Sequence, residues 1–226
     1  MRSALKPALF AGVRVVLFDL DGTLADTAPD LAGALNRLRV RRGLDALPLT
    51  QLRPVASSGA RGLLGVGLGR TPQDADYEPL RIEFLAEYES ALDRDSRLFD
   101  GARALLDALT VRGLRWGVVT NKAMRFTAPV VRGLGLADAE VVIAGDCTPH
   151  LKPHPASLLE ACARLKVPPA HCIYVGDDLR DIQAAHAAGM PAVAAGWGYL
   201  GESGDASRWG ADALINTPAD LLALLN

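Results

Sequence analysis

The sequence of 226 residues has few of the residues that staple small extracellular folds or bind zinc. It contains only three cysteines, at positions 147, 162 and 172, and their spacing matches neither a disulfide framework nor a zinc site. We interpret them as small buried thiols in a reducing compartment. It also contains no run of the ~18 to 20 apolar residues that a helix needs to cross a bilayer. We therefore expect no membrane partner.

The first 20 residues also lack the features of a secretory signal, although Arg2 and Lys6 stand among apolar residues. Arg14 interrupts the apolar run, and no small-x-small cleavage site follows it. The strongest apolar stretch leads directly into acidic residues. The sequence therefore predicts a soluble cytoplasmic protein.

An excess of basic charge is absent, since the formal net charge is -2. A nucleic-acid-binding protein normally has a clustered basic face, so we expect no nucleic-acid partner. The charges are unevenly distributed: residues 27 to 70 hold seven Arg and two Asp, whereas residues 71 to 96 hold two Arg and eight acidic residues. We interpret this as helix faces that pair with one another. The alternative is a basic wall that faces an anionic substrate.

Half of the residues are hydrophobic, and from residue 97 onward short apolar runs alternate with helical patterns. This alternation is typical of parallel strands joined by crossover helices, so we predict an α/β fold with a Rossmann-like, doubly wound parallel sheet. The predicted strands are Val13 to Leu20, Leu114 to Thr120, Val141 to Ala144, Cys172 to Gly176, Pro191 to Ala194 and Ala213 to Ile215. The predicted helices are Ala102 to Arg112, Arg125 to Leu134, Ala156 to Leu165, Asp181 to Ala188 and Pro218 to Leu225.

Residues 27 to 96 interrupt this rhythm, because they contain helical patterns at Ala28 to Arg42 and Tyr77 to Leu92 but no convincing strand. We predict that they form an all-helical cap domain inserted into a catalytic core made of residues 1 to 26 and 97 to 226. The cap can lie over the strand ends as a lid. We interpret its glycine-rich segment, Gly65 to Gly69, as a flexible turn.

Ligands of a doubly wound sheet bind at the carboxyl ends of the strands. Asp19 and Asp21 follow the first predicted strand, where alternation along an extended chain directs both carboxylates to the same side. With Asp177 after the fourth strand, these oxygen ligands favour Mg²⁺. The absence of nearby His or Cys disfavours zinc.

A carboxylate at a cation can attack phosphorus and form an aspartyl-phosphate, and we assign this role to Asp19. Asp21 is placed to protonate the leaving oxygen and then to activate water, as a general acid and base. Thr120 follows the second strand and can hold phosphate oxygens. Lys152 follows the third strand and can offset the negative charge of Asp19 and the phosphoryl group.

Four motifs lie in order at these strand ends: FDLDGT at Phe18 to Thr23, VVTN at Val118 to Asn121, LKP at Leu151 to Pro153 and VGDDLRD at Val175 to Asp181. Through them the sequence resembles the haloacid dehalogenase-type phosphohydrolases. The resemblance implies a Rossmann-like core with a helical cap, and a phosphatase that needs Mg²⁺. It implies a nucleophile at Asp19, an acid and base at Asp21, and Mg²⁺ held by Asp19, the Asp21 backbone carbonyl and Asp177, with Asp181 supporting them. The phosphate-binding positions of the family correspond to Thr120, Asn121 and Lys152.

Within this family, DGTLADTAPDL, TNK and the AAGMPAVAAGWGY segment resemble the phosphoglycolate phosphatase branch, which makes 2-phosphoglycolate the first candidate substrate. FDGARALLDAL, GLRWGVVTNK and the late RWGAD resemble phosphatases of N-acetylmuramic acid 6-phosphate. Arg61, in the predicted cap loop Ser57 to Arg61, can fork onto a substrate carboxylate. Both substrates carry a carboxylate, so Arg61 does not separate them. A surface arginine on a cap helix is an equally good interpretation of this residue.

Three alternatives use the same fold. A dehalogenase would need neither magnesium nor Asp21, so the presence of Asp21 favours phosphate chemistry. A phosphosugar mutase would return the phosphoryl group to a sugar, and free phosphate would not accumulate. A non-catalytic interaction protein would have lost some of the four motifs. The sequence leaves open whether the protein is a monomer or a homodimer.

Overall fold

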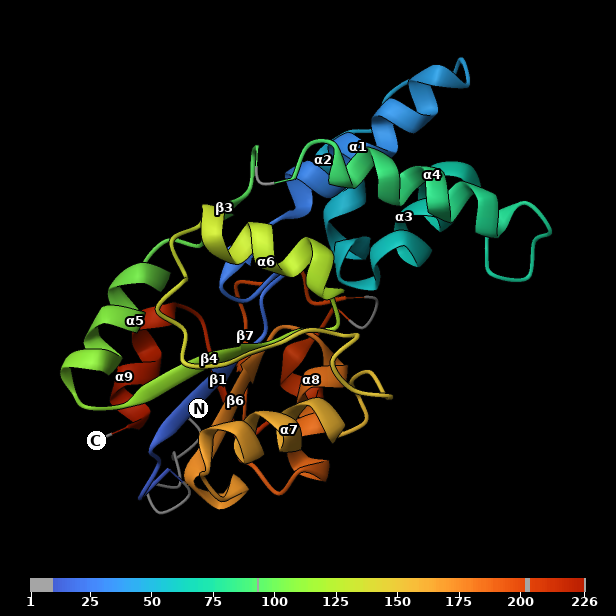
Figure 1. Ribbon diagram of the computed structural model, residues 1–226. Helices are drawn as coiled ribbons and strands as arrows, with labels where there is room; N and C mark the ends of the chain where they lie inside the picture. Colours follow the sequence, from blue (N-terminus) through green and yellow to red (C-terminus); the bar gives the residue numbers. More distant parts are fainter. Residues whose placement is uncertain (1–9, 93, 202–203, 226) are drawn as a thin grey trace.

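A computed structural model of the chain describes residues 10–92, 94–201 and 204–225. Six parallel strands form one sheet in the order β5-β4-β1-β6-β7-β8, and helices cover both of its faces (Figure 1). This confirms the predicted α/β fold with a doubly wound parallel sheet. The strands are β1 (Val15–Phe18), β4 (Arg115–Val119), β5 (Val142–Ile143), β6 (Cys172–Gly176), β7 (Ala192–Ala195) and β8 (Ala213–Ile215).

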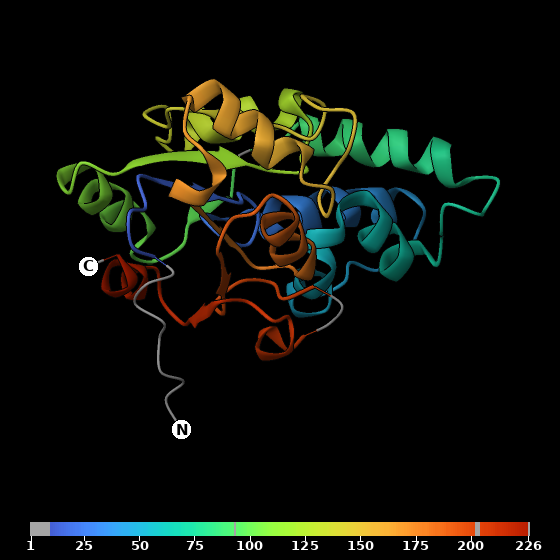
Figure 2. The same cartoon turned by 90° about the horizontal axis from the view of Figure 1, so that it is seen from below.

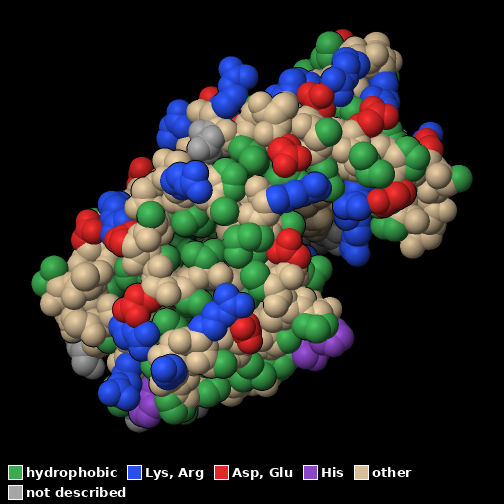
Figure 3. Space-filling model, in the orientation of Figure 1, with side chains coloured by type: hydrophobic (Ala, Val, Ile, Leu, Met, Phe, Trp, Pro, Cys, Tyr) green, Lys and Arg blue, Asp and Glu red, His purple; other side chains and the backbone are tan. Residues whose placement is uncertain are grey.

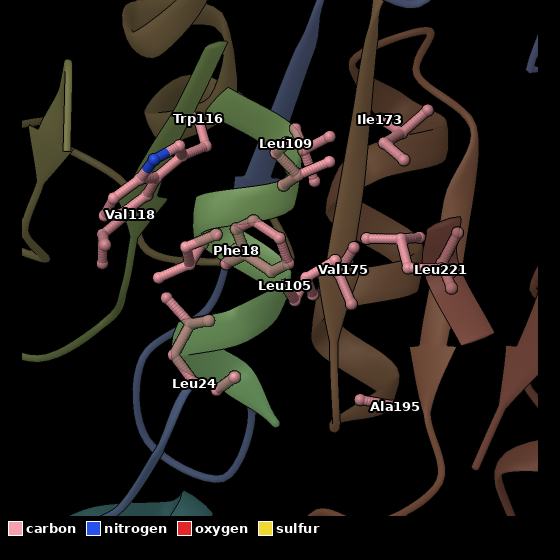
Figure 4. Packing of buried hydrophobic residues seen from close by; sticks show 14 of the residues in the cluster. Phe18, Leu24, Leu105, Leu109, Trp116, Val118, Ile173, Val175, Ala195 and Leu221 are labelled. Atoms are coloured by element: carbon pink, nitrogen blue, oxygen red, sulfur yellow. The ribbon is translucent and has the colours of Figure 1, made fainter. Parts of the chain in front are cut away.

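The central strands β1 and β6 are apolar because they bury side chains on both faces of the sheet. In β1, Val16 and Phe18 belong to one hydrophobic cluster, whereas Val15 and Leu17 belong to the cluster on the opposite face. Figure 4 shows the first cluster, where the helix that carries Leu105 and Leu109 lies over the strands. Helices α5 (Ala102–Val111), α6 (Met124–Gly133) and α9 (Leu221–Leu224) contribute to the first cluster, and α7 (Ala156–Leu165) and α8 (Leu179–Ala187) to the second.

A separate group of helices extends to one side of the sheet, as Figures 1 and 2 show. It is centred on a third hydrophobic cluster, in which Leu35, Leu63 and Phe84 are fully buried and which Phe126 and Tyr199 join from the sheet-bearing part. Its members are α1 (Ala28–Arg41), α2 (Leu49–Leu52), the 3-10 helix η2 (Arg53–Ser58), α3 (Gly59–Leu68) and α4 (Tyr77–Glu89). We call this group the cap.

Two short strands join the cap to the rest of the chain. Strand β2 (Ala25–Asp26) leads into the cap and pairs antiparallel with β3 (Arg97–Leu98), which leads out of it. Next to this pair, the buried carboxylate of Asp30 accepts hydrogen bonds from the backbone N–H groups of Asp95 and Ser96, at 3.0 and 2.9 Å. The limits at residues 27 and 96 stay a prediction for the boundary of an independent domain.

The glycine-rich segment of the cap is helical, so its interpretation as a flexible turn was wrong. Its residues 65 to 68 lie in α3, and Gly69 is the C-cap of this helix, where the backbone is left-handed with a φ of 63°. Glycine is needed inside this helix for packing. A Cβ at Gly67 would lie 2.5 Å from Leu35 Cδ2 on α1, and one at Gly62 would lie 2.6 Å from the Val55 carbonyl oxygen. Arg61 accordingly stands in the first turn of a helix and not in a loop.

Other boundaries differ from the predictions by one to three residues where local hydrogen bonds decide them. Helix α8 begins at Leu179, earlier than predicted, because Asp178 and Asp181 form a capping box. The helix predicted from Pro218 begins as a 3-10 helix, η5 (Pro218–Asp220). The Asp220 carboxylate accepts a hydrogen bond from the Thr217 N–H at 2.9 Å. Two further 3-10 helices in the described residues are η3 (Pro169–His171) and η4 (Ala206–Arg208).

The uneven charge distribution comes from paired helices, which confirms that interpretation. On α1, Arg37 and Arg41 lie 2.9 and 2.6 Å from carboxylate oxygens of Glu87 on α4, and Arg42 lies 2.8 Å from Glu83. Basic and acidic side chains are interspersed over the face seen in Figure 3. Exposed pairs of this kind each contribute only ~0 to 1 kcal/mol to stability.

The three cysteines are free thiols, and Cys162 and Cys172 are buried with their sulfur atoms 3.5 Å apart. In the part of the chain that the structure describes, we find no helix of the length and hydropathy that a membrane span requires. The cytoplasmic location stays a prediction.

We predict that Leu109→Ala lowers the free energy of unfolding by ~2 to 5 kcal/mol, because the side chain is fully buried under the sheet and its removal leaves a cavity. Val111→Ala on the same helix is the matched control. Its side chain is 88% exposed, so we expect a change within about 0.5 kcal/mol. Urea unfolding of both variants measures this, and equal losses would contradict the assigned core.

Candidate active site

A cavity of about 420 Å³ lies between the carboxyl ends of the central strands and the cap. From the sheet side it is lined by Asp19, Asp21 and Thr120, and by Lys152 from the loop after β5. All four were predicted to meet at this edge of the sheet. The cavity therefore joins the predicted catalytic residues to the underside of the cap.

Three carboxylates form a buried cluster at the base of this cavity. Oxygens of Asp19, Asp177 and Asp181 all lie within 4.8 Å of one another. Asp177 is fully buried and accepts hydrogen bonds from Thr23 Oγ1 and from the backbone N–H of Tyr199, both at 2.8 Å. The neighbouring backbone packs so closely that a Cβ at Gly198 would lie 2.1 Å from the Asp177 Cβ. Glycine at position 198 is therefore a requirement of this site.

The electrostatics of the cluster favour a bound cation. Burial raises the pKa of Asp19 to about 6, and the nearby Asp181 and Asp21 carboxylates add to the shift, while Lys152 opposes it. Burial, followed by the charges of Asp19 and Asp181, raises the pKa of Asp177 well above its usual range. Oxygen ligands alone, with carboxylates that repel one another, are the donor set that suits Mg²⁺. The residues present fit the predicted cofactor.

Lys152 is the cation that the chain itself supplies to the cluster. Its buried Nζ lies 2.9 Å from Asp19 Oδ1 and 2.7 Å from Asp181 Oδ1, and donates a hydrogen bond to the Tyr174 hydroxyl at 2.7 Å. Burial alone would lower the pKa of Lys152, but the two carboxylates outweigh burial and leave the pKa raised. Lys152 therefore stays protonated beside Asp19.

Asn121 holds the Lys152 backbone in place. Its Oδ1 accepts the Lys152 N–H at 2.8 Å, and its Nδ2 donates to the Lys152 carbonyl at 3.0 Å. The side-chain amide thus positions Lys152, and a role of Asn121 in binding substrate stays a prediction. Thr120 is nearly fully buried, and its Oγ1 accepts the Lys122 N–H at 3.2 Å, which leaves the hydroxyl proton to be donated.

The Asp21 carboxylate does not join the cluster, although strand alternation predicted a carboxylate pair with Asp19. Lys122 Nζ lies 2.8 Å from Asp21 Oδ1, and Thr27 Oγ1 donates a hydrogen bond to the same oxygen. The chain turns tightly after β1, where the Gly22 N–H bonds to the Ala25 carbonyl at 2.8 Å, so extended alternation ends there. The Asp21 side chain consequently lies between Lys122 and Thr27, at the start of α1, and lines the cavity.

Lys122 was missed as a site residue. Its place directly after Thr120 and Asn121, and the presence of only four lysines in the chain, were the available signals. Its contact with Asp21 spans 101 residues, so local patterns could not reveal the partner.

Asp181 occupies its position because of the capping box that starts α8. Its Oδ2 accepts the Asp178 N–H at 3.0 Å, which leaves Oδ1 to meet Lys152. A Cβ at Gly176 would lie 2.4 Å from the Asp181 Cβ, so this glycine makes room for the carboxylate. Arg180 follows Asp178 and donates to the carbonyl of Ser57 at 2.8 Å, which links α8 to the cap.

The cap and helix α6 close the cavity with an apolar wall and with arginines. Phe84 and Phe126 are buried in this wall. Arg61 lines the cavity with an exposed side chain, as predicted, and Arg81 and Arg125 line it as well. The last two were not predicted, and they lie outside residues 27 to 70, where a basic wall was the alternative interpretation.

Comparison with known proteins adds a family to this geometry. A model of haloacid dehalogenase-like hydrolases matches residues 13–189. A phosphoglycolate phosphatase of Xanthomonas campestris pv. campestris is 46% identical over 209 residues, which cover 92% of this chain and 94% of the relative. An N-acetylmuramic acid 6-phosphate phosphatase of Pseudomonas aeruginosa is 39% identical over 215 residues, with 95% of both chains covered.

A solved structure shares the whole architecture. The crystal structure of a predicted phosphoglycolate phosphatase from Haemophilus somnus is 26% identical, superposes with a TM-score of 0.82, and covers 96% of this chain and 99% of that one. The matched residues 13–189 include all four motifs and the cavity between sheet and cap. The chain therefore belongs to the haloacid dehalogenase-like hydrolase family.

Proposed function

We propose that this protein is a Mg²⁺-dependent phosphomonoester hydrolase that acts on a small phosphorylated acid through an aspartyl-phosphate at Asp19. The enzyme is a phosphatase, like the relatives that match over nearly its whole length. The observation that carries the mechanism is the buried cluster of Asp19, Asp177 and Asp181 with the Lys152 ammonium against it, at the base of a cavity.

Asp19 attacks phosphorus, because its carboxylate faces the cavity and Lys152 holds it at 2.9 Å. The bond between phosphorus and the leaving oxygen breaks as the bond to the Asp19 oxygen forms. The Thr120 hydroxyl donates a hydrogen bond to a phosphate oxygen, and Lys152 offsets the charge of the phosphoryl group.

Asp21, which lines the cavity beside Lys122, serves as general acid in this step and as general base in the next. In the second step it takes a proton from water, and that water attacks phosphorus. Free phosphate leaves and Asp19 is restored. A phosphosugar mutase would instead retain the phosphoryl group for a sugar, so accumulation of free phosphate distinguishes the two.

A Mg²⁺ ion would be held by the carboxylates of Asp19 and Asp177 and by the Asp21 backbone carbonyl, with Asp181 behind them. When bound, the ion would offset the negative charge of the carboxylates and of the phosphate. The reason to expect it is the raised pKa of Asp19 and Asp177, because like charges buried together call for a counter-charge.

Two substrates are candidates. The first is 2-phosphoglycolate, the substrate named for the Xanthomonas relative. N-acetylmuramic acid 6-phosphate is the second, and the cavity favours it. A volume of about 420 Å³ falls in the range of ~300 to 1,000 Å³ that holds drug-sized ligands, more than a two-carbon acid needs. The wall with Phe84 and Phe126 offers apolar packing that 2-phosphoglycolate cannot use.

We predict that Asp19→Asn lowers kcat by at least about 10³-fold, because the neutral amide cannot act as the nucleophile. Release of phosphate in the presence of Mg²⁺ is the measurement. Asp138→Asn is the matched control and should retain activity, because Asp138 is an exposed carboxylate that pairs with Arg103 and does not line the cavity. Turnover by Asp19→Asn near the wild-type rate would remove Asp19 as the nucleophile.

Asp21→Asn should slow the hydrolysis of an alkyl phosphate by ~10² to 10⁴-fold, because an alkoxide leaves poorly without a proton. The first step on p-nitrophenyl phosphate needs no such proton, so its phosphorylation rate should change little. Single-turnover release of p-nitrophenol measures that step. Equal losses on both substrates would contradict the assignment of Asp21 as general acid.

Arg61→Ala should raise KM for a phosphorylated acid by about 10-fold or more and leave KM for an uncharged alkyl phosphate unchanged, because the guanidinium pairs only with the carboxylate. Assays of 2-phosphoglycolate, N-acetylmuramic acid 6-phosphate and several sugar phosphates with wild type and variant test this. A large kcat/KM preference of the wild type identifies the substrate. An equal change in KM for all substrates would argue against carboxylate recognition by Arg61.

A further inference from the structure

The Tyr199 hydroxyl lies at the point where the cap begins. Tyr199 follows β7, in the sheet-bearing part of the chain, and its oxygen accepts hydrogen bonds from the backbone N–H groups of Thr27 at 2.7 Å and Ala28 at 2.8 Å. The same hydroxyl donates to Asp26 Oδ1 at 3.0 Å. One donor and two acceptor sites are all that a hydroxyl has, so each is used. Burial raises the pKa of Tyr199 well above its usual range, and the hydroxyl stays protonated.

Tyr199 accepts N–H groups at the start of helix α1 that the N-cap side chain cannot reach. The first N–H groups of a helix have no partner within it, and a Thr side chain at the N-cap normally accepts one of them. Thr27 is the N-cap of α1 but makes no side-chain cap bond. Its hydroxyl instead donates to Asp21. Pro29 in the first turn contributes no N–H, and the N–H groups of Thr27 and Ala28 both bond to the Tyr199 hydroxyl.

We infer that Tyr199 is a positioning residue for the general acid: its hydroxyl holds the backbone of Thr27 at the start of α1 and thereby places the Thr27 hydroxyl that orients Asp21. This inference rests on the proposed role of Asp21. The chain of contacts runs from Tyr199 through Thr27 to the carboxylate, and each contact is a hydrogen bond between buried or half-buried groups.

Neighbouring side chains fix the Tyr199 ring. Arg53 of the cap lies over it, with its Cζ 5.8 Å from the ring centroid, and also pairs with Asp26 at 2.7 Å. The Phe99 ring packs against it with a centroid separation of 6.4 Å. The backbone N–H of Tyr199 bonds to Asp177, so a change of the side chain alone leaves that contact in place.

The test is Tyr199→Phe, which keeps the ring and removes the hydroxyl. We measure single-turnover rates on an alkyl phosphate, which needs the general acid, and on p-nitrophenyl phosphate, which does not. The rate on the alkyl phosphate should fall by about 10-fold, part of the ~10² to 10⁴-fold that general acid–base catalysis supplies, and the aryl rate should stay within about twofold. In an Asp21→Asn background, Tyr199→Phe should cause no further loss.

Phe99→Leu is the matched control, because it loosens the packing around the same ring and leaves the hydroxyl intact. It should lower Tm and leave the ratio of the alkyl and aryl rates unchanged. Thr27→Val interrupts the same chain at its other end, and its effect on the ratio should not add to that of Tyr199→Phe. It also tests the inference if Tyr199→Phe folds poorly.

Two results would overturn the inference alone: equal losses on both substrates in Tyr199→Phe, or additive effects of Tyr199→Phe and Asp21→Asn. An unchanged ratio in Asp21→Asn itself would overturn the proposed role of Asp21 and this inference together. The two failures are therefore distinguishable.

Discussion

The buried ion pair of Lys152 with Asp19 and Asp181 is the interaction on which the site depends. Three carboxylates within 4.8 Å of one another repel, and burial adds a large desolvation cost, so the chain needs a fixed cation beside them. The parallel sheet makes this arrangement possible, since it brings the ends of β1 and β6 together although they are far apart in sequence. Asn121 then fixes the Lys152 backbone, and the capping box of α8 orients Asp181.

The cap and the chemistry share residues, so movement of one affects the other. Asp21 is bound between Lys122 and Thr27, the residue before α1 of the cap. Tyr199 contacts both Thr27 and Asp177. Arg180 beside the carboxylate cluster bonds to Ser57 of the cap. The lid role of the cap stays a prediction.

The sequence predicted the sheet well because continuous apolar runs, each followed by polar residues, mark buried parallel strands. It predicted the residues at the strand ends for the same reason. It failed where a distant partner decides the structure. Residues 65 to 69 looked like a flexible turn because their packing against Leu35 is a tertiary contact. The contacts of Asp21 with Lys122 and Thr27 are not foreseeable from alternation. Arg81 and Arg125 carry no local signal for the cavity that they line.

The most direct test of the account is to trap the covalent enzyme. Wild-type protein is mixed with an excess of substrate and Mg²⁺, quenched in acid within the first turnovers, digested and analysed by mass spectrometry. The account predicts a phosphoryl group on the peptide that contains Asp19, sensitive to hydroxylamine as an acyl phosphate is, and absent from Asp19→Asn. A phosphoryl group on another residue, or full turnover with no labelled enzyme at any quench time, would contradict it.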